Sequence, residues 1–381
     1  MTPIPRTEFA VTRDYVYLNH ASAGVLPNSS IAAIEKFARG SGAAGVLSTF
    51  AYDLRMSEYR ERIGRFIGAD GDEIAMIPAT GAGANVIALG LDWKPGDEVL
   101  LADDDFPANV VPWLALRRHG VAVRFVRIRE GRLTPDRLRT EISPRTRVVA
   151  LSWVSYADGY RHDLAALAEV AHRSGALLCV DAMQGLGALP LDVRAGNLDA
   201  VYAGGAKWML ALHGIGFLFV ARELRERLAL AMPGWRSMRD MWDFHNYDQP
   251  YAQDAMRFEG GTPNLLGTLS IVSAIELFER AGTAQIAAHI AGLTDRLCDG
   301  LQRIGARLVT VRGQLASSGI VTFEMPGCDS IEIGRSLERQ SIITTYRSSG
   351  IRVSPHGYNT EAEIDAALDA LRELAPIAVK A

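Results

Sequence analysis

Lysine is scarce in this chain, which has four lysines against thirty-six arginines. Three of the lysines are expected at the surface: Lys36 lies in a charged amphipathic stretch, Lys94 in the turn WKPGD, and Lys380 one residue from the end. Lys207 instead follows the apolar run LDAVYAGG and precedes Trp-Met-Leu, so it should close a buried strand. An amine shielded from water there can lose its proton and act as a nucleophile.

Cysteine is also rare. The three cysteines, Cys179, Cys298 and Cys328, are odd in number, widely spaced and without histidines at metal-ligand spacing. We therefore expect neither a disulfide framework nor a zinc site, and no bound metal.

Long apolar runs and clusters of one charge are missing as well. No stretch approaches the roughly 20 apolar residues of a membrane span, and the first residues lack the apolar core of a signal peptide. The net charge is −4, and the basic residues are scattered along the chain. These features predict a soluble, cytoplasmic protein that binds small molecules, without a membrane or nucleic-acid partner.

Short β-rich segments alternate with helical ones through the middle of the chain, which predicts an α/β domain. The segments are EIAMIPA, DEVLLAD, AVRFVRI, RVVALSWV, ALLCVD, LDAVYAG and GIGFLFV, between residues 73 and 220. Later segments around 319–327, 330–339, 350–355 and 361–374 suggest a smaller α+β unit. Residues 233–264 are rich in aromatic, proline and polar residues and are expected to form a loop over a site or a partner.

Candidate ligand groups follow several of these strands, where open α/β sheets bind ligands. The turn TGAGAN, which begins at Thr80, opens a helix whose free amides suit a phosphate, although a tight glycine turn explains it equally well. Phe106 could stack on a planar ring or could be a core residue. Asp181 could share a proton with a pyridinium nitrogen or could cap a helix. Lys207 follows one strand later, so both groups could hold one ring.

In this order, these segments resemble the class V aminotransferase family of pyridoxal phosphate enzymes, which includes cysteine desulfurases, kynureninases and isopenicillin N epimerases. The resemblance covers nearly the whole chain. It implies that Lys207 is the Schiff-base lysine, that Asp181 pairs with the pyridine nitrogen and that Gln184 meets the 3-hydroxyl oxygen. It also implies that Thr80 and Gly81 hold the phosphate.

The resemblance assigns further residues to the cofactor and the substrate. Phe106, in the run DFPAN, matches the ring-stacking aromatic, and Tyr156 matches a position near the 3-hydroxyl group. In RFEGGTPN, Thr262 matches a threonine that reaches the phosphate of the neighbouring subunit, which implies a homodimer with shared active sites. In GIRVSPHGYN, Arg352 matches the arginine that binds the substrate α-carboxylate.

The family fold implied is fold type I. It has a large domain with a central, mostly parallel seven-stranded sheet, placed at residues 18–255, and a smaller α+β domain formed by residues 1–17 and 256–381. Asn19 and His20 are further substrate-site candidates, although His20 and His356 could equally be structural. Other candidates near the reacting carbon are Ser22, His213, Trp235, Arg236 and Tyr358.

Departures from the family pattern bear on the reaction. The segment SIITTYRSSGIR is too short for the mobile cysteine loop of the desulfurases, so we expect a protein that is not a cysteine-loop desulfurase. Gly204 and Ala206 replace a serine and a histidine that contact the phosphate in relatives.

The resulting prediction is a lyase that performs β-elimination or C–S cleavage, or an aminotransferase. An isopenicillin N epimerase-like racemase or epimerase and a non-catalytic cofactor-binding protein remain alternatives. A Rossmann-type nucleotide enzyme is disfavoured, because TGAGAN lacks the GxGxxG spacing.

Overall fold

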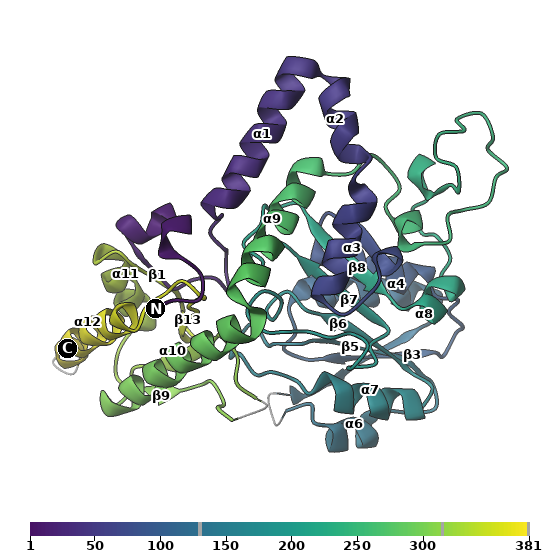
Figure 1. Cartoon of the computed structure of the whole chain (residues 1–381). Helices are drawn as coiled ribbons and strands as arrows, with labels where there is room; N and C mark the ends of the chain where they lie inside the picture. Colours follow the sequence, from purple (N-terminus) through teal and green to yellow (C-terminus); the bar gives the residue numbers. More distant parts are fainter. Residues whose placement is uncertain (129–131, 314–315, 379–381) are drawn as a thin grey trace.

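A seven-stranded sheet forms the centre of the chain in the computed structural model, which describes residues 1–128, 132–313 and 316–378. The strand order is β2-β8-β7-β6-β5-β3-β4, and only β8 runs antiparallel to its neighbours (Figure 1). The strands are β2 (Ile74–Ile77), β3 (Glu98–Ala102), β4 (Ala122–Val126), β5 (Thr146–Ser152), β6 (Leu177–Asp181), β7 (Ala200–Gly204) and β8 (Gly216–Val220). All seven predicted strand segments are confirmed, as is the mostly parallel seven-stranded sheet.

Helices cover both faces of this sheet, which explains why its strands are continuously apolar. One face packs against α4 (Thr80–Gly90), α5 (Val111–Leu114) and α8 (Arg222–Arg227). The other packs against α3 (Met56–Phe66), α6 (Pro135–Glu141), α7 (Leu164–Arg173) and α9 (Leu265–Ala281). Every residue of β2, β3, β6, β7 and β8 is buried.

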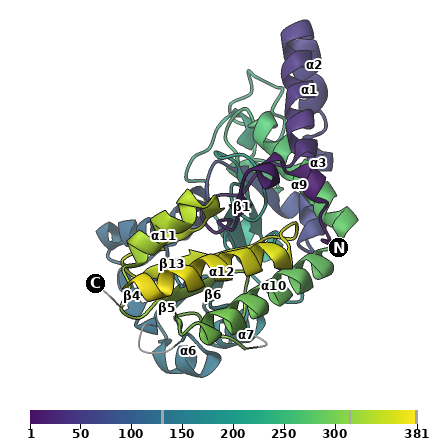
Figure 2. The ribbon, with the colours of Figure 1, turned by 90° about the vertical axis from the view of Figure 1, so that its left-hand side faces the viewer.

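A smaller α+β unit is built on a four-stranded antiparallel sheet of order β12-β13-β10-β9. Its strands are β9 (Arg307–Leu308), β10 (Val321–Glu324), β12 (Thr345–Arg347) and β13 (Gly350–Val353). The helices α10 (Thr283–Arg303), α11 (Ser330–Arg339) and α12 (Glu361–Ala378) pack with it (Figure 2). β1 (Val16–Tyr17) pairs with β11 (Ile342–Ile343), so the N-terminal residues join this unit.

The division at residues 17/18 and 255/256 stays a prediction. α9 lies after the second boundary, yet it packs mainly on α1 and α3 beside the large sheet. α10 then continues into the small unit, where it contacts α12.

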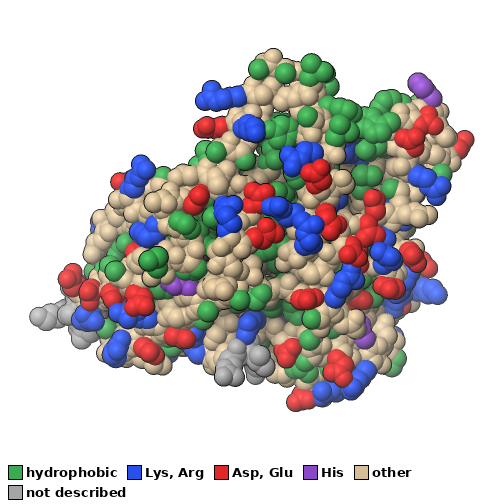
Figure 3. Space-filling view, in the orientation of Figure 1, with side chains coloured by type: hydrophobic (Ala, Val, Ile, Leu, Met, Phe, Trp, Pro, Cys, Tyr) green, Lys and Arg blue, Asp and Glu red, His purple; other side chains and the backbone are tan. Residues whose placement is uncertain are grey.

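An arm formed by α1 (Asn28–Ala44) and α2 (Val46–Asp53) projects from the body (Figure 1). Gly45, with φ of 54°, makes the turn between the two helices. Hydrophobic side chains gather on the tip of the arm and between the arm and the loop of residues 233–254 (Figure 3). Within the described ranges, no helix is long and apolar enough to cross a membrane.

Candidate active site

Asp181 and Lys207 lie at the same edge of the large sheet. Asp181 ends β6, and Lys207 follows the end of the adjacent parallel strand β7 by three residues. Burial lowers the pKa of Lys207 to about 8, against an opposing effect of Asp181 and with further lowering by Arg352 and Arg347. Burial, reinforced by the charge of Asp105, raises the pKa of Asp181 to about 7. The predicted lysine and carboxylate are therefore within electrostatic reach of each other, and both titrate near neutral pH.

Two aromatic rings lie beside the lysine. Lys207 Nζ is 5.2 Å from the centroid of the Phe106 ring, and Tyr156 packs edge-on against Phe106 with centroids 5.3 Å apart. Phe106 is 41% exposed, which rules out the alternative that it is a core residue. A face of this ring is available for stacking on a planar group.

The N-terminus of α4 supplies groups suited to a phosphate. The first amides of a helix have no intrahelical acceptor, and the preceding residue, Ala79, offers no side-chain cap. Thr80 Oγ1 accepts a hydrogen bond of 3.0 Å from the backbone N–H of Gly204, at the end of β7. Gly204 has no side chain to contribute to this site, but its backbone N–H binds Thr80 directly.

Arg352 on β13 is a buried cation without an acidic partner among the described residues. Its guanidinium donates to Tyr156 O at 2.6 Å and to Ser22 Oγ at 2.7 Å, and its Nε has no partner. Burial lowers its pKa to about 10, with a further contribution from Arg347. Because a buried charge is stable only when it is paired, this arginine is suited to an anionic ligand.

The N-terminal candidates separate into two groups. Asn19 Oδ1 accepts from Thr345 Oγ1, which also accepts from Arg352, so Asn19 belongs to the network around the guanidinium. His20 is fully buried, with its ring nitrogens hydrogen-bonded to Ser354 O and to the Tyr358 hydroxyl. Because both ring nitrogens of His20 are engaged, the residue is structural and offers no free ring nitrogen to a substrate.

His356 is structural too. Its Nε2 lies 3.0 Å from Trp208 O, its Nδ1 accepts from Gly357 N, and burial lowers its pKa to about 4. Gln184 uses its amide to accept from Trp208 Nε1 and to donate to Ala21 O. One N–H of Gln184 remains for a further acceptor, so its predicted contact with a ring oxygen stays a prediction.

Residues 257–264 are held at both ends. Glu259 forms a bidentate ion pair with Arg60, both contacts at 2.8 Å, and also accepts from Met76 N. Asn264 caps α9 by accepting from Gly267 N at 2.9 Å. Thr262 lies between these anchors and is exposed. Its predicted reach into a neighbouring subunit stays a prediction.

The remaining candidates lie outside this cluster. Arg236 is buried in an ion pair with Asp53, His213 is exposed, and Trp235 packs in the aromatic loop against Trp242. None of these side chains contacts Lys207 or Arg352 in the described structure.

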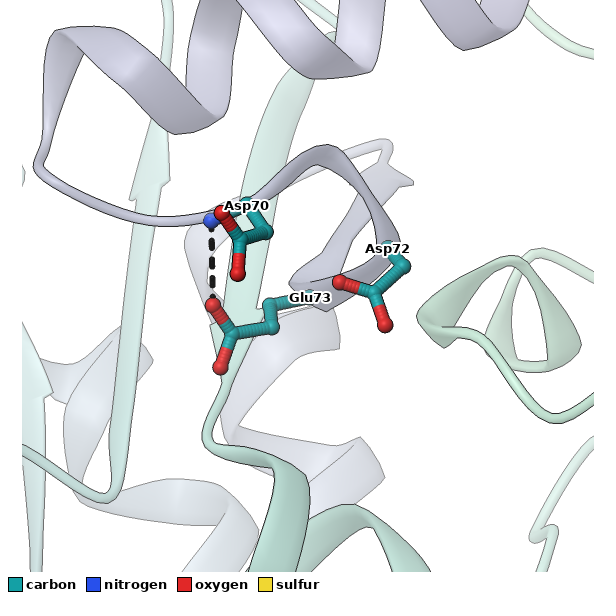
Figure 4. A group of neighbouring side chains, drawn as sticks. All are labelled: Asp70, Asp72 and Glu73. Atoms are coloured by element: carbon teal, nitrogen blue, oxygen red, sulfur yellow. Dashed lines mark hydrogen bonds between the residues drawn. The ribbon is translucent and has the colours of Figure 1, made fainter.

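Three carboxylates, Asp70, Asp72 and Glu73, lie close together at the turn before β2 (Figure 4). Each already has an arginine partner: Arg194 pairs with Asp70 and Glu73, and Arg225 pairs with Asp72. This cluster is therefore an ion-pair network that joins the turn before β2 to α8 and to the loop before β7.

Sequence reasoning missed two charged groups near Arg352. Arg347 and Asp104 line the same cavity as Arg352, with Thr345 and Tyr156. Arg347 precedes the two-residue turn of the β12–β13 hairpin, and it lies five residues before Arg352. The sequence does show two arginines, Arg347 and Arg352, close together. Only the pairing of β12 with β13 shows that both line the same cavity.

The residues fit the predicted pyridoxal phosphate. An amine with a lowered pKa, a carboxylate with a raised pKa, an exposed aromatic face and free helix amides converge at one sheet edge. In addition, the guanidinium of Arg352 forms no ion pair among the described residues, so it can pair with a substrate carboxylate.

Comparisons with known proteins agree with this geometry. The family model for Aminotransferase class-V matches residues 16–367. A probable cysteine desulfurase from Methanothermobacter thermautotrophicus is 29% identical, with 97% of each chain covered. The apo structure of a cysteine desulfurase from Thermococcus onnurineus is 25% identical, with a TM-score of 0.88 and 98% of each chain covered.

A further solved structure shares the fold. The cystine C–S lyase C-DES, in complex with its reaction product cysteine persulfide, is 23% identical, with a TM-score of 0.89 over 96% of this chain and 99% of that one. The prediction that this chain is not a cysteine desulfurase has no support from these comparisons, because curated relatives carry that name.

Proposed function

Since the chain belongs to the aminotransferase class-V family and is a pyridoxal phosphate-dependent enzyme, we propose that it acts on an α-amino acid at the site formed around Lys207. The observation that carries the proposal is the position of Lys207 Nζ over Phe106, within electrostatic reach of both Asp181 and Arg352. A cofactor-binding amine and a substrate-binding cation are thereby available in one site.

Lys207 would hold the cofactor aldehyde and would also serve as the base that takes the α-proton of the substrate. A pKa of about 8 supports both roles, because an appreciable fraction of the amine is unprotonated near neutral pH. Pyridoxal phosphate supplies an electron-poor ring that accepts the electrons left by that proton. Asp181 would face the ring nitrogen, and Thr80 with the first amides of α4 would hold the phosphate.

Arg352 would bind the α-carboxylate. Its two terminal nitrogens match the two oxygens of a carboxylate, and Tyr156 O and Ser22 Oγ fix its orientation. Asn19 is neutral, and its amide oxygen accepts from Thr345 Oγ1, which lies beside the guanidinium. A substrate held in this way would present its α-carbon to Lys207.

We favour C–S bond cleavage by elimination, and without a protein cysteine as sulfur acceptor. The names of the relatives support C–S chemistry. The β12–β13 hairpin closes with Arg347 opposite Gly350, which leaves no room for a cysteine loop before Arg352. Cys328 packs against the core of the small unit and does not line the cavity at Arg352, while Cys179 and Cys298 are buried.

Transamination and epimerisation share the same first proton transfer, so products must separate them. The altered residues before Lys207 do not favour a non-catalytic protein. Gly204 N–H binds Thr80, and Ala206 O accepts from Gly24 N at 2.8 Å.

We also propose a homodimer with shared active sites. The exposed Thr262, fixed between two anchors, would reach the partner's phosphate. The arm exposes Val46 and Leu47 at its tip and Leu54 just after α2, by 64–79%, and exposed apolar area of this kind marks an interface.

The decisive experiment is reconstitution with pyridoxal phosphate. The wild type should gain a near-visible absorbance band that borohydride removes, and Lys207→Ala should not. Product analysis for pyruvate, ammonia, keto acid and D-amino acid then separates elimination, transamination and epimerisation. A wild type that stays colourless would contradict the proposal.

A further inference from the structure

A cavity of about 350 Å³ extends from Arg352 along the β12–β13 hairpin, within the size range of small-molecule sites. Its charged and polar lining includes Asp104, Tyr156, Thr322, Thr345, Arg347 and Arg352. Tyr156 connects it to the reacting amine, because the Tyr156 ring packs on Phe106, over which Lys207 lies.

If Arg352 binds the α-carboxylate, as the proposed function requires, two charges in this cavity remain unassigned. Arg347 forms no ion pair or hydrogen bond with another described residue, and neither does Asp104. An exposed arginine without a partner is common. Arg347 differs because its charge lowers the pKa values of both Lys207 and Arg352, which places it within electrostatic reach of the reacting groups.

Asp104 is the unpaired member of an acidic group. Asp103 accepts from Ile128 N, Asp105 accepts from Ser152 N and Asn109 Nδ2, and Asp158 forms an ion pair with Arg132. Burial and the charges of Asp158, Asp105 and Asp103 raise the pKa of Asp104 to about 6, against an opposing effect of Arg132. A bound cation at this wall of the cavity would offset that repulsion.

We propose that the substrate is an α-amino acid whose side chain ends in a second amino-acid group, with Arg347 binding the distal carboxylate and Asp104 the distal ammonium. The cavity then carries one cation for each carboxylate, Arg352 for the near one and Arg347 for the far one, and one acid for the far amine. Two amino-acid halves joined through sulfur fit this pattern and carry the C–S bond of the proposed reaction.

Four L-cysteine thioethers test the two contacts separately. S-methyl-L-cysteine has a neutral end, S-carboxymethyl-L-cysteine adds a carboxylate, S-(2-aminoethyl)-L-cysteine adds an amine, and L-lanthionine adds both. Dissociation constants are measured from the change in cofactor absorbance, so that binding is read whatever the reaction. Wild type should bind lanthionine at least about fivefold more tightly than the S-methyl compound, because partly desolvated charge pairs contribute about a kilocalorie or more.

Two variants should lose different ligands. Arg347→Ala should weaken the binding of the carboxymethyl compound and of lanthionine about fivefold, and it should leave the binding of the aminoethyl compound unchanged. Asp104→Asn should weaken the binding of the aminoethyl compound and of lanthionine about fivefold, and it should leave the binding of the carboxymethyl compound unchanged. Arg339→Ala, an exposed arginine on α11, is the matched control and should bind all four as wild type does.

The outcomes distinguish this inference from the function on which it rests. Equal wild-type affinity for all four compounds, or equal losses with every ligand in both variants, would overturn the inference while the Lys207-dependent absorbance band still supports the proposed function. Absence of that band would overturn the proposed function itself.

Discussion

The backbone N–H of Gly204 donates a 3.0 Å hydrogen bond to Thr80 Oγ1 and so joins the end of β7 to the first residue of α4. With that lone pair engaged, the hydroxyl proton is directed elsewhere. It can be donated to an anion at the helix N-terminus, where the amides and the helix dipole also favour negative charge.

Thr80→Val should therefore weaken pyridoxal phosphate binding by about tenfold to a hundredfold, the range expected for one lost hydrogen bond to a charged group. Valine keeps the shape of threonine and removes only the hydroxyl. Thr80→Ser retains it and should bind the cofactor nearly as wild type. Titration of the apoenzyme with cofactor, followed by absorbance, gives both dissociation constants; an unaffected valine variant would assign the phosphate to other groups.

The reactivity of Lys207 in the apoenzyme should rise with pH around a midpoint of about 8, below the ordinary lysine value near 10.5. The sign follows from burial, which disfavours the charged ammonium, so the unprotonated amine appears at lower pH. Limited acetylation read by mass spectrometry gives the profile, with the peptide containing Lys94 as an internal reference. Removing the opposing carboxylate in Asp181→Asn should move the Lys207 midpoint lower still, and a shift to higher pH would contradict this electrostatic assignment.

Arg352→Ala should raise KM for an amino-acid substrate by roughly tenfold to a hundredfold and leave the cofactor absorbance intact. Arg352→Lys keeps the charge but loses the paired donors, so it should recover only part of the affinity. Steady-state kinetics and the absorbance spectrum measure the two effects separately. Loss of the cofactor band in Arg352→Ala would show that this residue is structural.

Gly24→Ala should destabilise the fold, because a Cβ there would lie 2.0 Å from the carbonyl oxygen of Lys207. We expect a loss of about 1–3 kcal/mol in the free energy of unfolding, together with weaker cofactor retention. Gly42→Ala, in α1, is the control: its Cβ meets nothing within 4 Å, and it should gain up to about 1 kcal/mol from helix propensity. Urea unfolding compares the two, and equal stabilities would show that the Lys207 turn yields easily.

Leu47→Glu at the arm tip should convert a dimer into a monomer in sedimentation velocity, because Leu47 is 79% exposed and belongs to the apolar patch of the arm. Val311→Glu places the same charge on another exposed apolar residue, in the small unit, and should leave the sedimentation coefficient unchanged. A wild type that sediments as a monomer would refute the shared-site arrangement.

Local pattern was sufficient for the large sheet. The run ALLCVD becomes β6 and LDAVYAG becomes β7, since continuous apolar segments of this length are stable only when both faces are covered. The arm of α1 and α2 was not predicted as such, because Val46 and Leu47 at its tip are exposed among the described residues and leave no periodic signal of an internal core.

Local sequence was sufficient to identify some of the site residues and not others. Lys207 and Asp181 were found because each follows a buried strand, and parallel strands bring their carboxyl ends to one edge. His20 could not be decided in advance, because its two hydrogen bonds come from residues 354 and 358, more than 330 positions away. Arg347 and Asp104 were missed because they meet in one cavity from different units of the chain.

By itself the sequence determined the family, the cofactor and which functional residue follows each strand. These depend on local apolar runs and on the residues at their ends. Only the tertiary structure decided which charges are paired and which remain free. Arg236 and His20 have partners inside the protein, whereas Arg352 forms no ion pair in the part of the chain that the structure describes. Pairing is a property of distances across the fold, and no local pattern records it.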